Sequence, residues 1–166
     1  MDTSTWVTVG TSVAAVIGAL AGTLLAGWMH GQASRVAQIA ADAKAHRAEV
    51  LTTVTELVTA LDDHRRVQTV RARERTRSLA RTGGVEATDE QYTPAVHQTR
   101  SAITSPSVTL RIICPELAGV AERAVGATFA IRNAQTLADL ERMRVQSKLV
   151  CDALIAEAGQ VLARTA

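Results

Sequence analysis

Arginine is the residue type whose density in this sequence most suggests chemistry. Residues 64–82 hold seven arginines and one acid, Glu74, so their charge is 7 − 1 = +6, while the rest of the chain sums to −4. Guanidinium groups bind phosphate and carboxylate groups through paired hydrogen bonds, so this run could contact nucleic acid or an acidic protein surface. On a helix, Arg66, Arg73 and Arg77 share one face. The arginines considered for binding an anionic partner are Arg65, Arg66, Arg73, Arg77 and Arg81.

A second interpretation of the arginine run needs no ligand. Cations near the C-terminus of a helix complement its macrodipole, and the run ends just before Gly83-Gly84, where we expect a helix to stop. No aromatic residue lies among the arginines, and no helix-turn-helix or other DNA-reading motif is visible. A solvated helix end is therefore the favoured interpretation, and nucleic-acid binding remains the alternative.

Two clusters contain residue types that bind metals or move protons. In the Asp-Asp-His sequence at residues 62–64, neighbours face different directions on a helix and cannot easily converge on one ion. Asp42, His46 and Glu49 do share a face, but such residues are common on exposed helices. The sequence contains no nucleophile elbow, phosphate-binding glycine loop, HExxH or CxxC motif. We therefore expect a non-catalytic protein without a metal or cofactor.

The two cysteines, Cys114 and Cys151, are too few for a disulfide framework. We expect both to be free, buried, small apolar side chains in a reducing compartment.

A long apolar run near the N-terminus predicts a transmembrane helix. No charged residue lies between Asp2 and Arg35, and Val7–Met29 is long enough, at about 1.5 Å per residue, to cross a hydrocarbon core of about 30 Å. Trp6 and Trp28 bracket the run, as expected of residues at the membrane interface. A cleaved signal peptide would need basic residues before a shorter apolar core, so an uncleaved anchor is the better interpretation.

The charges that flank this run predict its orientation. Only Asp2 precedes it, whereas Arg35, Lys44 and Arg47 follow it. By the positive-inside rule, the protein is a single-pass protein of the cell membrane with its N-terminus outside and its larger domain in the cytoplasm.

Small residues recur every four positions along the predicted anchor. Such a stripe lets two helix backbones approach closely in lipid, so we expect a homo-oligomer that forms through the anchor and the helix that follows it. The stripe consists of Gly10, Ala14, Gly18, Gly22 and Ala26.

The composition predicts an all-α fold. Aromatic residues make up only 2% of the chain, and the abundant Ala, Leu, Arg and Glu favour helix over strand. We expect a transmembrane anchor at 1–29, a long stalk helix at 30–82, a loop at 83–93, and at 94–166 helices that pack on the distal stalk as a small antiparallel bundle. The stalk has apolar residues at coiled-coil-like spacing, which are Val36, Ala40, Ala43, Val50, Val54, Leu57 and Leu61.

Prolines and caps predict the helix boundaries after the loop. Thr93-Pro94 should begin a helix that ends before Ser105-Pro106, and Pro115 should begin another that reaches about Arg132. Residues 108–114 alternate like a strand, but a lone strand has no partner here, so a short helix or extended connector is preferred. The sequence at 136–139 resembles a capping box that begins a last helix, which ends near Arg164.

Three short segments resemble a group of small actinobacterial proteins, mostly from Streptomyces, that have an N-terminal anchor and a helical tail. These segments are Leu61–Arg66, Thr99–Thr104 and Ala127–Arg132. Some members of the group are similar to the KilB-type proteins of conjugative plasmids. The resemblance implies a membrane partner in plasmid transfer or spread and implies no catalytic activity.

Three functions follow from these observations. The first is an interaction or scaffold protein of the membrane, with a protein partner in a transfer apparatus. The second is a membrane-tethered nucleic-acid binder that uses the basic strip at 65–81. The third is a pore-forming protein, which the glycine and alanine stripe disfavours because water-lined pores need polar faces.

Overall fold

The computed structural model describes the backbone of residues 3–164 and the side chains of residues 35, 37–81 and 83–164. Within residues 3–164 the chain is helical and contains no strand, which confirms the predicted all-α class. The elements are α1 (Thr3–Thr82), α2 (Glu86–Ile113), the 3-10 helix η1 (Pro115–Leu117), α3 (Ala118–Ala130), the 3-10 helix η2 (Ile131–Asn133) and α4 (Leu137–Arg164).

The chain forms two compact units, one up to Ala45 and one from His46 onward. The predicted anchor at 7–29 belongs to the first unit, where the backbone is helical. Its side chains lie outside those that the structure describes, as do both tryptophans and the stripe of small residues. Among the residues that were described, no helix has a stretch both long and apolar enough to cross a membrane. In the stalk, Ala40 and Ala43 are exposed.

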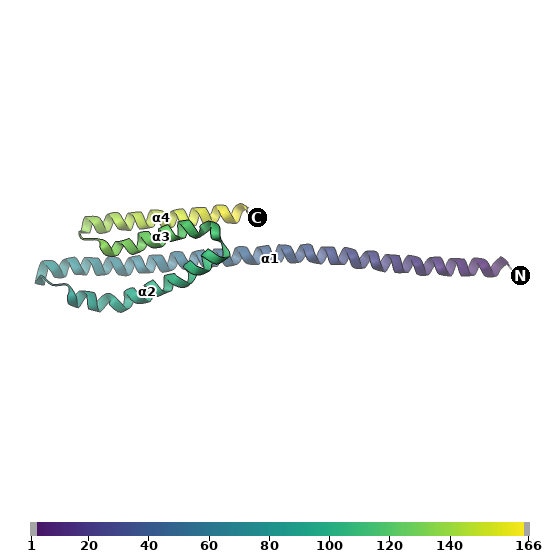
Figure 1. The fold of residues 1–166 in the computed structure, drawn as a ribbon, viewed down its shortest axis with the longest axis horizontal. Coiled ribbons are helices and arrows are strands. Elements are labelled where there is room, and N and C mark those ends of the chain that lie inside the picture. The colour runs from purple at the N-terminus through teal and green to yellow at the C-terminus, as the bar shows by residue number, and fades with distance from the viewer. Residues whose placement is uncertain (1–2, 165–166) are drawn as a thin grey trace. The chain divides into compact units, whose positions relative to one another are not determined.

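The second unit consists of four helical segments that alternate in direction (Figure 1). The part of α1 from His46 runs one way, α2 returns beside it, and α3 and α4 form a second antiparallel pair. The connections have three to six residues, and such short connections favour helices that fold back on their predecessors. The described helices of this unit therefore form an up-and-down bundle.

Glycine at position 83 ends α1 where the sequence predicts. Gly83 has a φ of +72°, a left-handed conformation that side chains disfavour, and its N–H donates to the carbonyl of Leu79 at 3.1 Å. The predicted loop at 83–93 is wrong, however, because α2 already begins at Glu86. The acids Glu86 and Asp89 lie in its first turn, where they complement the positive end of the helix dipole.

Two prolines lie inside α2 instead of marking its ends. The predicted helix start at Pro94 and the predicted end before Pro106 are both wrong, because α2 continues through each of them to Ile113. An interior proline removes one helical hydrogen bond and bends the helix, and the ribbon of α2 is curved (Figure 1). Pro106 is buried in the bundle, whereas Pro94 is exposed. Residues 108–113 are accordingly the last turns of a helix.

The boundaries of α3 and α4 agree more closely with the sequence. Pro115 begins the short 3-10 helix η1, which leads directly into α3. Before α4, the hydroxyl of Thr136 accepts a hydrogen bond from the N–H of Asp139 at 3.0 Å, as an N-cap does. Hydrogen bonding to the Thr136 hydroxyl, and then pairing with Arg142, lowers the pKa of the Asp139 carboxyl. The predicted cap is confirmed.

The interior of the bundle is built from the apolar faces that the spacing predicts. Val50, Val54, Leu57 and Leu61 of α1 are all buried, and Leu57 and Leu61 have 0% exposure. They pack in one cluster with residues of α2, η1, α3 and α4. The other main members are Ile103, Leu110, Leu117, Val120, Ala124, Leu154 and Ala158.

Two cysteines and one serine lie in this interior. Cys114 and Cys151 are both free and buried, as expected. Ser147, the one polar member of the apolar face of α4, is fully buried and its hydroxyl lies 2.8 Å from that of Thr128 on α3. A hydrogen bond between two buried hydroxyls satisfies both of them, which explains why serine is tolerated there.

Candidate functional site

The arginine run occupies two opposite faces of α1. Arg66, Arg73 and Arg77 are exposed, as their shared face predicts, and Arg81 is exposed as well. Arg65 and Arg71 instead point toward other helices, with side chains that are 17% and 25% exposed. The run is therefore not one uniform binding strip.

Arg65 is used for packing between helices. It forms an ion pair with Asp62 one turn before it and lies against Cys151 of α4. Burial raises the pKa of the Cys151 thiol, and the positive charge of Arg65 only partly offsets this effect. The thiol is therefore protonated and unreactive at neutral pH.

Arg71 connects α1 to α2. Its Nη2 and Nε atoms lie 3.0 and 3.1 Å from the same carboxylate oxygen of Asp89. Both side chains are partly buried, so this ion pair is screened less than a surface pair. Arg71 thus holds the two helices together close to the turn at Gly83.

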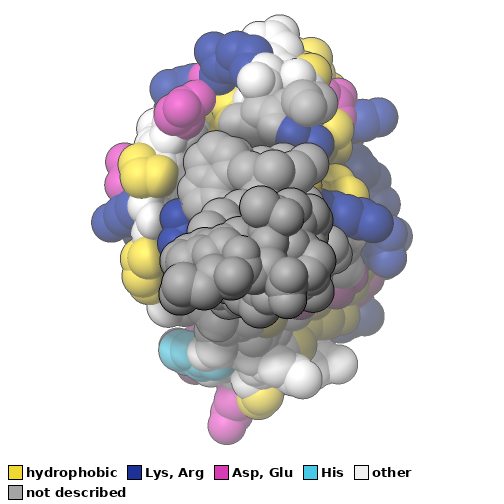
Figure 2. Space-filling view, turned by 90° about the vertical axis from the view of Figure 1, so that its right-hand side faces the viewer, with side chains coloured by type: hydrophobic (Ala, Val, Ile, Leu, Met, Phe, Trp, Pro, Cys, Tyr) yellow, Lys and Arg dark blue, Asp and Glu magenta, His cyan; other side chains and the backbone are white. Residues whose placement is uncertain are grey.

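The exposed arginines of α1 form an outward row, and its members differ in their ion-pair partners. The row consists of Arg66, Arg73, Arg77 and Arg81. Arg66 lies 2.8 Å from a carboxylate oxygen of Asp62, and Arg77 pairs with Glu74. Among the described ion pairs, none includes Arg73 or Arg81. On the face of the protein seen in Figure 2, Lys and Arg side chains likewise lie next to Asp and Glu side chains. The outward row is therefore only partly neutralised and stays available to an anionic partner.

The metal hypotheses find no support in the geometry. Asp42, His46 and Glu49 are all exposed on α1. At residues 62–64, the two acids pair with arginines while His64 is buried, so their side chains diverge as helical geometry requires. Among the described residues, no group of three or more His, Cys, Asp or Glu side chains could hold a metal ion.

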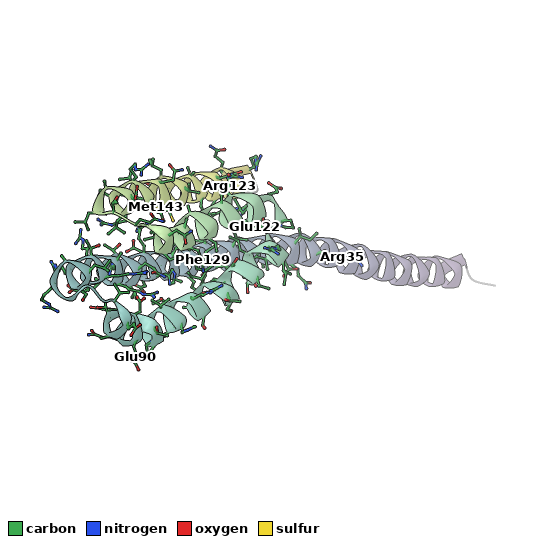
Figure 3. All side chains as sticks on the ribbon, turned by 60° about the vertical axis from the view of Figure 1, so that its left-hand side comes forward. Arg35, Glu90, Glu122, Arg123, Phe129 and Met143 are labelled. Carbon is green, nitrogen blue, oxygen red and sulfur yellow. The ribbon has the colours of Figure 1, made fainter. Side chains whose placement is uncertain are left out.

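The most distinctive polar cluster of the bundle surrounds His64. Its side chain is 2% exposed, and its Nδ1 lies 2.8 Å from the Thr99 hydroxyl of α2. Its ring meets that of Phe129 on α3 edge to face, with centroids 5.2 Å apart and an interplanar angle of 75°. Phe129 lies between α3 and α1 in Figure 3. The guanidinium of Arg100 lies 5.3 Å from the centroid of the same phenyl ring.

Hydrogen-bond donors and acceptors in this cluster determine the form of the imidazole. The Thr99 hydroxyl donates to the carbonyl of Ala95 at 2.9 Å, so it must accept a hydrogen bond from Nδ1–H of His64. Nε2 is then the acceptor, and the amide nitrogen of Gln68 lies 3.3 Å from it. Burial lowers the pKa of His64, and the charge of Arg100 lowers it further. His64 is therefore a neutral residue at neutral pH.

This pKa shift predicts a pH dependence of stability. Below the ordinary value of 6.5, the unfolded chain binds a proton at His64 that the folded chain does not. The free energy of unfolding should therefore fall as the pH drops from 6.5 toward the lower folded pKa, and the contribution is fully present above 6.5. Urea unfolding at several pH values measures this slope. His64→Gln should flatten the dependence of the free energy of unfolding on pH. His97→Gln, at an exposed position, should leave that dependence unchanged. Equal slopes in both variants would contradict the role assigned to His64.

The three segments that carry the family resemblance meet at this cluster. Leu61–Arg66 supplies His64, Thr99–Thr104 supplies Thr99 and Arg100, and Ala127–Arg132 supplies Phe129. Sequence reasoning found no partner for these residues, because they lie on three helices that only folding brings together. Each of the three segments contributes a side chain to the inward face of its helix. That shared position is the one signal that could have located the cluster.

Comparisons with known proteins agree with that resemblance. The family model described as KilB plasmid transfer protein matches residues 51–162, which fall inside the second unit. The chain is also similar to Protein KilB of Streptomyces lividans, with 34% identity over 150 residues that cover 90% of this chain and 96% of that protein. No solved structure matches the chain.

Proposed function

The chain belongs to the family of KilB plasmid transfer proteins, and from this premise we propose that it is a membrane-anchored, non-catalytic interaction protein of plasmid transfer or spread. The similarity to Protein KilB over 90% of the chain is the observation that carries the proposal. The part matched by the family model lies within the four-helix unit, so we assign the interaction function to that unit.

A binding function suits the chemistry of the unit better than catalysis does. The buried polar side chains of His64, Gln68, Thr128 and Ser147 are engaged with one another, with Thr99 or with aromatic rings. Such satisfied groups stabilise a packed interior and are not poised to attack a substrate. Exposed charged side chains, in contrast, suit the reversible recognition of a partner.

The anchor assigned to this protein is Val7–Met29. Twenty-three residues of helix span about 35 Å at about 1.5 Å per residue, which exceeds a hydrocarbon core of about 30 Å. The absence of charge between Asp2 and Arg35, together with the basic residues that follow, supports an inner-membrane orientation with the four-helix unit in the cytoplasm. The small-residue stripe and the exposed alanines of the stalk support self-association of this first unit.

Plasmid spread in the plasmid-bearing host tests the proposed process. Deleting the coding sequence should reduce spread of the plasmid from transconjugant cells, because the membrane partner of the transfer apparatus is lost. Expression of the full chain in trans should restore spread. Unchanged spread after deletion, with transfer genes otherwise intact, would contradict the proposal.

A second candidate function, nucleic-acid binding, is favoured by the outward arginine row, in which Arg73 and Arg81 form no ion pair among the described residues. We expect Arg66, Arg73 and Arg77, each replaced by Gln, to reduce binding of the detergent-solubilised chain to duplex DNA in fluorescence anisotropy. If all three contact phosphates, the slope of log K against log salt should decrease in magnitude by about 0.9 for each arginine removed.

The matched control for this candidate replaces three exposed arginines elsewhere, Arg111, Arg123 and Arg164, with Gln. This variant loses the same charge from other faces of the unit. An equal loss of DNA binding in both variants, or no salt-dependent binding by the unmodified chain, would reject nucleic-acid binding at the outward row.

A further inference from the structure

A recessed cleft lies beside α1 on the face opposite the outward arginine row. A groove of about 570 Å³ separates Arg71 and Arg75 of α1 from the residues that connect α3 to α4. A smaller hollow of about 240 Å³ shares Gln68, Arg71 and Arg132 with this groove and extends to His64 and Arg100. We call the two together the cationic cleft.

The lining of the cleft has an excess of positive charge. Four guanidinium groups, from Arg71, Arg75, Arg100 and Arg132, line the groove and the hollow, and no acidic side chain is among their lining residues. Asp89 neutralises only Arg71. Among the described ion pairs, none includes Arg75 or Arg132.

Like charges gathered in a recess repel one another, and the repulsion weakens when an anion enters between them. Arg75, Arg100 and Arg132 are exposed, so solvent screens part of this repulsion, whereas Arg71 is partly buried. Burial is the larger cause of the lowered pKa of His64, and the positive charge of Arg100 lowers that pKa further. The cleft thus has the excess positive charge that an anionic ligand would neutralise.

Neutral hydrogen-bonding groups complete the site. The amides of Asn133 and Gln135 line the groove and are exposed. α4 begins just after these connecting residues, so the positive end of its dipole adds to the potential at that rim. Amides beside guanidinium groups can bind both the charged oxygens and the neutral part of a ligand.

We propose that the cationic cleft binds the phosphate groups of a small soluble phosphorylated ligand. Its volume lies in the range of small-molecule sites, and arginine forks match the geometry of phosphate oxygens. The cleft is an open groove bounded by α1, α2 and the α3–α4 connection, and its short length suits a compact ligand. A nucleic-acid backbone needs an open row of contacts, which is what the outward face offers.

Isothermal titration of the detergent-solubilised full chain with inorganic pyrophosphate tests this site, and ATP serves as a second probe. We expect saturable binding that weakens at least about tenfold when Arg75 and Arg132 are both replaced by Gln, because each removes a charge-assisted hydrogen bond. The matched variant Arg73→Gln with Arg77→Gln removes the same charge from the outward face and should bind as the unmodified chain does. Equal weakening in both variants, or no saturable binding of either probe, would overturn the proposal.

Histidine resonances provide a readout that does not depend on the folding of a variant. In the unmodified chain, pyrophosphate should shift the imidazole signals of His64 and His97, which line the cleft, and should leave that of the exposed His46 unchanged. It should also raise the pKa of His64, since an anion offsets the charge of Arg100. Shifts that are the same at all three histidines, or absent from all three, would also overturn the proposal.

Discussion

Replacing Leu57 with alanine should lower the free energy of unfolding of the four-helix unit by about 2–5 kcal/mol. The side chain is fully buried in the central cluster, so the substitution removes its apolar contacts and leaves a cavity that the neighbouring helices fill only in part. A domain of this size is stable by roughly 5–15 kcal/mol, so the loss is a large fraction of the total. Urea unfolding of the full chain in detergent, followed by circular dichroism, measures it.

Leu51 provides the control for this prediction. It lies on the same helix but is 56% exposed, so Leu51→Ala should change the free energy of unfolding by no more than about 0.5 kcal/mol. If the two variants unfold at the same urea concentration, the buried face of α1 is assigned incorrectly.

The apolar pattern of α1 was sufficient to predict which face of this helix is buried, and the glycine that follows it was sufficient to predict where it ends. Val50, Val54, Leu57 and Leu61 repeat at the spacing of one helix face, and all four are buried. Gly83 adopts the left-handed conformation that a glycine after a helix commonly has. Both predictions depend on residue spacing and on a backbone preference of glycine, which are local in the chain, so single-sequence reasoning can reach them.

Proline was a misleading boundary signal in α2. Pro94 and Pro106 suggest a helix start and a helix stop by their local chemistry, yet α2 is one continuous helix across both. Pro106 is buried, and its burial depends on neighbouring helices that a local rule does not contain.

The candidate sites were predicted only in part, because some of their residues share one helix face and others are brought together only by folding. The shared face of Arg66, Arg73 and Arg77 follows from helix geometry alone, and these side chains are exposed as expected. The hydrogen bond from His64 to Thr99 joins residues 35 positions apart. The cationic cleft likewise combines arginines from α1, α2 and η2. Neither arrangement has a periodic signature in the sequence.

Placing charge in the predicted anchor should release the protein from the membrane. Leu20→Arg together with Leu24→Arg puts two guanidinium groups near the middle of Val7–Met29. Each costs roughly 2.5–3.5 kcal/mol at the centre of a transmembrane helix on scales from insertion experiments. Immunoblots of membrane and supernatant fractions should show that most of the variant has moved to the supernatant.

Two matched variants separate anchoring from self-association. Leu20→Ile with Leu24→Ile keeps the anchor apolar and should remain in the membrane. Gly18→Leu with Gly22→Leu should also remain there but should lose the oligomers captured by crosslinking in cells, because bulky side chains prevent close approach of the helices. Retention of the arginine variant in washed membranes would show that something other than this segment holds the protein there. Unchanged crosslinked species in the leucine variant would exclude the small-residue stripe as the contact.

Fractionation of the unmodified protein tests the central claim, that the four-helix unit acts while tethered to a lipid bilayer. Cells that produce the full chain are broken, and their membranes are collected and washed at alkaline pH, which removes peripheral proteins. The account predicts that the intact polypeptide stays with the washed membranes and is released only by detergent. Recovery of the intact polypeptide in the supernatant without detergent would contradict it.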